Sequence, residues 1–137
     1  MKEISAEELK LNPSTLIGKE WALLTAGNKD GYNTMTVSWG QMGELWNKPT
    51  TVVYIRPQRY TKEFVDKSDY YTLSFLPDGH REALSYLGSH SAEMRISWQR
   101  PTLQALQRTI TLYRAGKACA CLQEAVQTAY DARFFYR

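Results

Sequence analysis

The chain has 137 residues, of which 43% are hydrophobic and 12% aromatic, which suits a single domain with a packed core. Its net charge is +3 and its basic residues form no run, so the composition argues against a nucleic-acid partner. No apolar stretch is long enough to span a bilayer, and the polar N-terminus is unlike a signal peptide. Cys119 and Cys121 are too close for a disulfide within one extended segment and lack partners for a metal site. We therefore expect a reduced, cytoplasmic protein without a membrane partner or a bound metal.

Hydrophobic periodicity and turn residues predict a mainly β protein with short helices. In chain order we first expect a helical turn with capping-box spacing at 5–8 that ends at Asn12-Pro13, and then strands at 21–26 and 32–39 joined by an Asp-Gly turn. Gly40 and Gly43 are expected to loosen the chain after the second strand, before a turn at 47–49. The remaining elements are a strand at 51–55, a helix at 63–67, a strand at 70–76, and a helix at 81–87 stopped by Gly88. After residue 91 strand alternation largely disappears. Leucine and isoleucine spacing at 103–110 and apolar spacing at 122–126 predict one or two helices there.

Two arginines lie in the turn that follows the apolar strand at 51–55. Pro57 cannot continue a central strand, so the chain must leave the sheet between Arg56 and Arg59. Thr61 is a candidate N-cap of the next helix, whose amides and dipole would add to the two guanidinium groups. Guanidinium groups match phosphate oxygens, so the turn is interpreted as an anion site, with a phosphomonoester as the ligand that fits it best. The alternative is a solvated basic corner without a ligand.

A strip of polar side chains and one indole follows the strand at 32–39. Hydroxyl groups and backbone amides can match the ring carbonyls and nitrogens of a flat heteroaromatic ligand, and an aromatic side chain can cover its face. The residues are Asn33, Thr34, Thr36, Ser38 and Trp39. The alternative is an ordinary solvent-facing strand with Trp39 in the core. Together with the arginine turn, the strip favours a ligand with a flat head and a phosphate tail.

Four motifs, at 33–39, 53–61, 71–75 and 88–91, resemble the flavin reductase-like family in its flavoredoxin branch. The resemblance implies an FMN-binding split β-barrel of six antiparallel strands, a homodimer, bound FMN, and hydride or electron transfer with NADH or NADPH as donor. By the same resemblance Asn33, Thr34, Met35, Thr36, Val37, Ser38 and Trp39 would line the isoalloxazine and ribityl chain, Arg56, Arg59, Tyr60 and Thr61 would hold the phosphate, and Ser89, His90 and Ser91 would lie near the flavin. No catalytic acid or base is assigned, because a lone histidine in a polar turn is more often structural.

The resemblance covers residues 3–91, and the tail at 92–137 departs from it. The family typically continues with Gly-Arg-Asp and further strands, whereas this chain has Ala-Glu-Met-Arg and is shorter. We therefore expect an incomplete split barrel at 1–91 followed by a tail outside the family pattern. One interpretation is a reading-frame error, because freely chosen codons for 92–101 and 118–127 give family-like segments when nucleotides are dropped. The other is a genuine tail that covers the open edge.

Three functional hypotheses follow from these observations. The first is a flavin-dependent oxidoreductase. The second is a non-catalytic FMN-binding module, and the third is an inactive, truncated member of the family.

Overall fold

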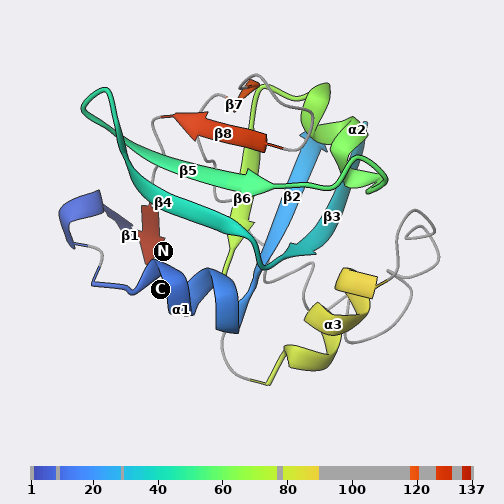
Figure 1. The fold of residues 1–137 in the computed structure, drawn as a ribbon, viewed down its shortest axis with the longest axis horizontal. Coiled ribbons are helices and arrows are strands. Elements are labelled where there is room, and N and C mark those ends of the chain that lie inside the picture. The colour runs from blue at the N-terminus through green and yellow to red at the C-terminus, as the bar shows by residue number, and fades with distance from the viewer. Residues whose placement is uncertain are drawn as a thin grey trace.

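The computed structural model describes residues 2–8, 10–28, 30–76, 79–89, 118–120, 126–130 and 134–136. As predicted, these residues form a mainly β structure with short helices (Figure 1). The elements are β1 (Lys2–Ile4), η1 (Ala6–Glu8), α1 (Pro13–Thr15), η2 (Leu16–Glu20), β2 (Ala22–Asn28), β3 (Gly31–Val37), β4 (Gly40–Leu45), β5 (Lys48–Tyr54), α2 (Thr61–Asp66), β6 (Tyr71–Ser74), α3 (Arg81–Ser89), β7 (Ala118–Ala120), β8 (Val126–Tyr130) and β9 (Phe134–Tyr136).

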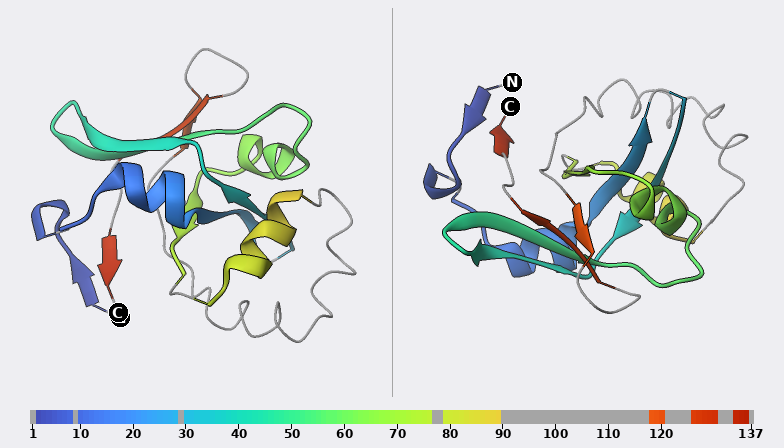
Figure 2. Two further views of the ribbon diagram at one scale, coloured as in Figure 1. Left: turned by 60° about the horizontal axis from the view of Figure 1, so that its bottom comes forward. Right: turned by 90° about the horizontal axis from the view of Figure 1, so that it is seen from above.

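The strands form three antiparallel sheets, with the orders β3-β2-β6, β4-β5-β8-β7 and β1-β9. Among the described strands no sheet closes on itself, so the six-stranded barrel that the resemblance implies is present only as separate sheets. This agrees with the expectation of an incomplete barrel. The pairing of β1 with β9 places the first and last strands side by side, as both views of Figure 2 show.

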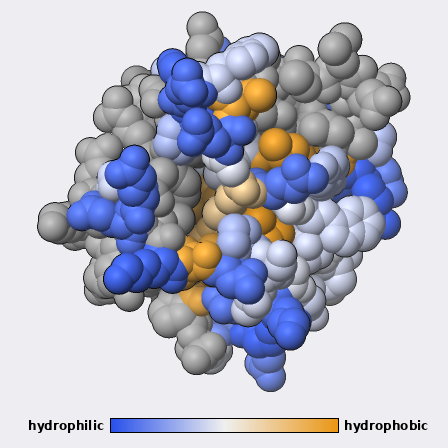
Figure 3. All heavy atoms as spheres, turned by 60° about the vertical axis from the view of Figure 1, so that its left-hand side comes forward, coloured by the Kyte–Doolittle hydropathy of each residue, from blue (hydrophilic) through white to orange (hydrophobic). Residues whose placement is uncertain are grey.

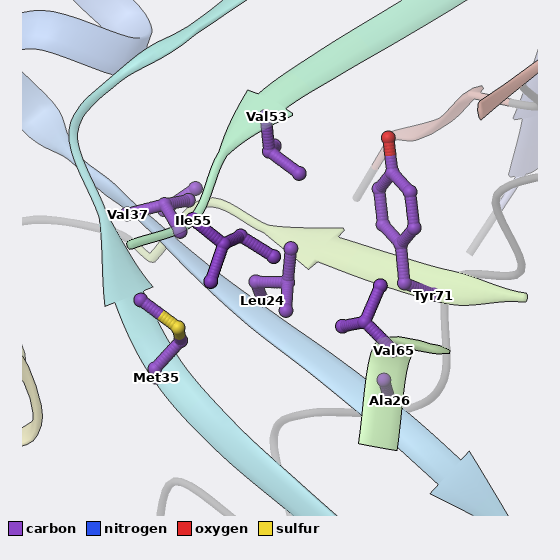
Figure 4. Close-up of a cluster of buried hydrophobic side chains, with 9 residues drawn as sticks. Leu24, Ala26, Met35, Val37, Val53, Ile55, Val65 and Tyr71 are labelled. Atoms are coloured by element: carbon purple, nitrogen blue, oxygen red, sulfur yellow. The ribbon is translucent and has the colours of Figure 1, made fainter. Parts of the chain in front are cut away.

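The main core lies between the first sheet, the end of β5 and α2. Alternate residues of β2 and β3 point toward it because side chains alternate between the two faces of a strand. Figure 4 shows the apolar side chains converging from these elements, and the buried ones are Ala22, Leu24, Ala26, Met35, Val37, Val53, Ile55, Val65 and Tyr71. The Tyr71 hydroxyl donates to the Thr51 carbonyl oxygen at 3.0 Å, which gives this large buried side chain a polar partner and ties β6 to β5.

The opposite face of the same sheet is more polar and is covered in part by α3. Leu23 packs there against three buried apolar residues of α3, Ala83, Leu84 and Leu87. The hydroxyl groups of Thr25 and Thr34 bond each other at 2.8 Å across the β2–β3 pair. The two faces of this sheet therefore pack against different partners: one forms the main core, and the other contacts α3.

Two local signals in the sequence are confirmed atom by atom. In the predicted capping box the Ser5 amide donates to the Glu8 carboxylate at 2.9 Å, and the Glu8 amide donates to the Ser5 hydroxyl at 3.3 Å. At the β2–β3 hairpin the Asn28 side-chain oxygen accepts from the amides of Asp30 and Gly31. At these two places, side chains close in sequence determine the local structure.

The prediction for residues 40–50 was wrong. Instead of loosening at Gly40 and Gly43, the chain forms β4, which pairs with β5 along its whole length. The turn lies one or two residues earlier than expected, at Trp46 and Asn47, whose φ angles of 52° and 58° are those of a two-residue hairpin turn. Pro49 is accommodated because pairing of β5 with β8 begins only at Thr50.

Three helical predictions also need correction. Asn12 does not end a helix but begins one, since its side chain accepts from the amides of Ser14 and Thr15 and caps α1. Gly88 does not stop α3, which continues to Ser89. In the tail, Val126 lies in a strand rather than a helix, because β8 pairs with β5. Residues 103–110 and 122–125 lie outside the described residues.

The surface of the described residues is mixed in character. On the face drawn in Figure 3, hydrophobic residues form small patches separated by hydrophilic ones. Among the described helices, none has the length and apolar character needed to cross a bilayer.

The close approach of β4 to β5 at Gly40 makes a stability prediction. A Cβ atom at this position would lie 2.6 Å from the Val52 carbonyl oxygen, a backbone atom that cannot move aside cheaply. We expect Gly40→Ala to lower the free energy of unfolding by about 1–3 kcal/mol, measured by urea denaturation.

Gly43→Ala is the matched control, because it lies in the same strand and has open space around the added Cβ. It should change stability little or raise it slightly. Equal losses for the two variants would contradict the proposed steric cause.

Candidate functional site

A cavity of about 260 Å³ opens where the end of β3, the arginine turn and α3 meet. It is lined by Trp21, Met35, Thr36, Val37, Ser38, Trp39, Tyr54, Arg56, Arg59, Ser85, Gly88 and Ser89. These residues come from four separate stretches of the sequence. The site therefore exists only once the first sheet, β5 and α3 have packed together.

The end of β3 and the residues after it supply one long side of the cavity. Thr36 is half-buried, and its hydroxyl donates to the Leu84 carbonyl oxygen at 2.6 Å, which attaches α3 to this strand. Ser38 is half-buried and Trp39, just beyond the strand, is 57% exposed. The indole of Trp39 is thus available to a ligand and is not a core side chain.

The turn at 56–59 is closed by a hydrogen bond from the Arg59 amide to the Arg56 carbonyl oxygen at 3.0 Å. This tight geometry brings both arginine side chains to the cavity. The Arg56 guanidinium carbon lies 5.3 Å from the centroid of the Trp39 ring, within the range of a cation–π contact. One side chain therefore combines a positive charge with a defined position beside the indole.

Arg59 is held from the opposite side, by α3. Its guanidinium donates to the Leu87 carbonyl oxygen at 3.3 Å. Burial, and secondarily the neighbouring charge of Arg56, lower the pKa of Arg59 from its usual value, although an arginine remains charged in proteins. Neither arginine has an acidic partner among the described residues, where the ion pair found joins Lys62 to Asp66. The cavity thus carries two positive charges that an anion could neutralise.

The start of α2 differs from the prediction for Thr61. Thr61 is the first residue of the helix and not its N-cap, and its hydroxyl accepts from the Asn33 side-chain amide at 2.8 Å. The amides of Lys62 and Glu63 already donate to the carbonyl oxygens of Arg59 and Tyr60. With those two amides occupied and only six residues in α2, the two guanidinium groups are the main feature of the cavity that could attract an anion.

The wall formed by α3 consists of small residues. The Ser89 hydroxyl donates to the carbonyl oxygens of Ser85 and Tyr86 within its own helix, at 3.0 and 3.1 Å. A Cβ on Gly88 would lie 3.6 Å from the Cβ of Thr36, an ordinary van der Waals distance, so α3 lies against β3 at this point. Small side chains on this wall leave room for a ligand.

The structure brings together most of the predicted site residues but not all of them. Those that line the cavity are Met35, Thr36, Val37, Ser38, Trp39, Arg56, Arg59 and Ser89. Four others lie outside its lining: Asn33 bonds Thr61, Thr34 bonds Thr25, and the Tyr60 ring packs edge-on against Phe64 at 5.2 Å. His90 and Ser91 lie outside the described residues.

Four lining residues were missed by sequence reasoning: Trp21, Tyr54, Ser85 and Gly88. Tyr54 could have been found, because it lies two residues before Arg56 in a strand whose other face is buried. Gly88 was interpreted as a helix stop and as the first residue of the motif at 88–91, but it was not named as a site residue. Trp21 gave no signal, since its backbone conformation and its contact with α3 are set by residues far apart in the sequence.

Chemically, the cavity combines two cations, an exposed indole and several hydroxyl groups. Such a set suits a ligand with an anionic end and a flat, partly polar ring. Its described lining contains no carboxylate, histidine or cysteine side chain. The arrangement therefore favours binding and orientation over proton transfer by the protein.

The comparisons with solved structures agree on the fold. Flavoredoxin of Desulfovibrio vulgaris (Miyazaki F) is similar with a TM-score of 0.61 and 16% identity, covering 98% of this chain and 76% of that chain. Flavoredoxin from Methanosarcina acetivorans gives 0.60 and 16%, covering 94% and 75%. An FMN-binding protein from Thermus thermophilus with bound p-hydroxybenzaldehyde gives 0.61 and 18%, covering 98% and 81%. A comparison with curated proteins found no significant match.

The family comparison covers most of the sequence. The model of the flavin reductase-like domain matches residues 15–133, a range that includes the cavity and extends into the tail. By this match, the chain belongs to the flavin reductase-like domain family.

Proposed function

We propose that this protein binds FMN in the cavity at the end of β3. The observation that carries the proposal is the pair of arginines, Arg56 and Arg59, that reach the cavity beside Trp39 without an acidic partner among the described residues. Membership of the flavin reductase-like family and the likeness to flavoredoxins and an FMN-binding protein support the choice of ligand.

The residues present fit the chemistry of FMN. Arg56 and Arg59 would bind the phosphate through charge-assisted hydrogen bonds. Thr36, Ser38 and Trp39 would accompany the ribityl chain and the ring along the end of β3. Asn33, Thr34, Tyr60 and Thr61 would then act indirectly, because their contacts hold β2, β3 and α2 in place.

The proposed reaction is hydride or electron transfer, with NADH or NADPH as the electron donor. Bound FMN supplies that chemistry, while the protein supplies orientation and electrostatics. The two guanidinium groups would anchor one end of the ligand, and the small side chains of α3 would leave access to it. No side chain of the described cavity lining is assigned as an acid or base.

A second candidate is an FMN-binding module without turnover. It is favoured by the lack of any acid, histidine or thiol in the described cavity lining, which is fully compatible with a binding site alone. An inactive, truncated member of the family is a related candidate, because it too would show no turnover. Both differ from the first candidate in what happens when an electron donor is added.

A homodimer is part of the proposal. The β4–β5 hairpin supports it, because its tip carries Leu45, 37% exposed, and Trp46, 79% exposed, at the edge of a sheet. Sedimentation equilibrium should give twice the chain mass of 15.8 kDa.

The phosphate role of the arginines is tested by comparing FMN with riboflavin, which lacks the phosphate. We expect Arg59→Ala and Arg56→Ala each to weaken FMN binding by tenfold or more, corresponding to about 1.5–3 kcal/mol for a lost charge-assisted contact. Riboflavin affinity, measured by the same fluorescence titration, should change little.

Lys67→Ala removes a positive charge from the exposed end of α2, outside the cavity lining, and is the control for general electrostatics. Its FMN affinity should equal that of the wild type. Equal weakening of FMN and riboflavin by the arginine variants would contradict the phosphate assignment.

Anaerobic mixing of the FMN-loaded protein with NADH or NADPH separates the two candidates. For an oxidoreductase we expect the flavin absorption band to bleach within the time of mixing and to return on admission of air. A loaded protein that keeps its band with both donors would instead be the binding module.

A further inference from the structure

Trp21 lines the cavity, and its indole ring is in contact with Arg81, which is not a lining residue. Neither residue belongs to the motifs that indicated the ligand. Trp21 connects η2 to β2, and the Arg81 guanidinium carbon lies 3.3 Å from the centroid of its indole ring. The Arg81 side chain also donates a hydrogen bond to the Lys19 carbonyl oxygen. Arg81 therefore covers one part of the indole and ties the first residue of α3 to the segment before β2.

The backbone of Trp21 is held in a conformation that bulky residues rarely adopt. Its φ and ψ angles are 67° and 156°, in a region occupied almost only by glycine. Such a conformation persists only where surrounding contacts determine it, here the stacked Arg81 and the packing of the indole against Leu23 and α3. The indole is thus placed at the cavity by several independent contacts.

Two arginines mark two positions along α3, one as part of the helix and one through a hydrogen bond to it. Arg81 is its first residue, and Leu87, whose carbonyl oxygen accepts from Arg59, lies six residues further on. At 1.5 Å per residue these positions are about 9 Å apart along the helix axis. Arg59, Trp21 and the small residues of α3 line the same cavity, so one ligand there can contact Arg59 at one end and Trp21 at the other.

We propose that Trp21, positioned by Arg81, is the residue that contacts the ring end of the ligand and selects for a flat aromatic system. This proposal rests on FMN as the ligand and adds a second aromatic contact at the end of the cavity away from the phosphate. Trp39 lies beside Arg56, one of the two arginines proposed to bind the phosphate, whereas Trp21 is held by Arg81, which lies outside the cavity lining. The ring contact is independent of the phosphate, and this independence makes it testable.

The test is a fluorescence titration of the full-length protein with FMN and with riboflavin. We expect Trp21→Leu to weaken both ligands by about tenfold and to leave the ratio of their affinities unchanged. Trp21→Phe, which keeps an aromatic ring, should stay within about threefold of the wild type. Tyr32→Leu, at the start of β3 and outside the cavity lining, is the control and should bind as the wild type does.

Trp21→Phe also gives a readout that a purely structural role would not move. Because the ring end of the ligand would lie against the indole, replacing Trp21 by Phe should reduce the FMN-induced quenching of tryptophan emission and shift the flavin absorption band. This measurement holds even where Trp21→Leu folds poorly, which a thermal unfolding curve would reveal.

Three outcomes overturn the proposal in distinguishable ways. Unchanged affinities, quenching and flavin band in folded Trp21 variants would remove Trp21 from the ring contact. A loss confined to FMN would place Trp21 at the phosphate end instead. Wild-type protein that binds neither FMN nor riboflavin would overturn the proposed function itself, and the inference with it.

Discussion

The hydrogen bond from the Asn33 side-chain amide to the Thr61 hydroxyl fixes the arginine turn against β3. Both residues are buried, so this bond of 2.8 Å is shielded from competing water. On the other side of the turn, the Tyr54 amide donates to the Trp39 carbonyl oxygen at 3.1 Å. The segment between Tyr54 and Thr61 is therefore attached at one end to β3 and at the other to Trp39 just beyond it, which keeps the backbone of both arginines near the end of β3.

This attachment explains how two like charges are kept together in one site. Arg56 lies against the Trp39 ring and Arg59 donates to a helix carbonyl oxygen, so each cation has a favourable neighbour that does not neutralise it. A carboxylate in either place would have satisfied the charge and blocked an anionic ligand. Placing the groups before a ligand arrives avoids the cost of ordering two long side chains at the moment of binding.

Much of the local structure could be predicted from the sequence, because the responsible interactions span only a few residues. The Ser5–Glu8 capping box and the Asn28 turn are of this kind. The features that were missed depend on distant partners. Gly40 does not loosen the chain but lies in a paired strand, where its lack of a side chain permits the close approach of the Val52 carbonyl oxygen. Trp21 reaches the cavity through a contact with Arg81, sixty residues along the chain.

The candidate site shows the same division. Arg56, Arg59 and Trp39 could be predicted because a strand, a proline and a turn indicate where their side chains emerge. The role of Thr61 could not, because a threonine at a helix start can cap the helix or bond a neighbouring strand, and only packing decides. In the tail, pairing of β8 with β5 overrode helix-like spacing at Val126, as long-range strand pairing can do. The division of the chain after residue 91 stays a prediction, and the genomic nucleotide sequence tests the reading frame.

The absorption spectrum of the purified protein, recorded after incubation with FMN and removal of unbound ligand, tests the central claim most directly. If the arginine turn and the end of β3 form a flavin site, the protein will be yellow and will carry about one FMN per chain. A colourless protein that retains no flavin, although it is folded, would contradict the account.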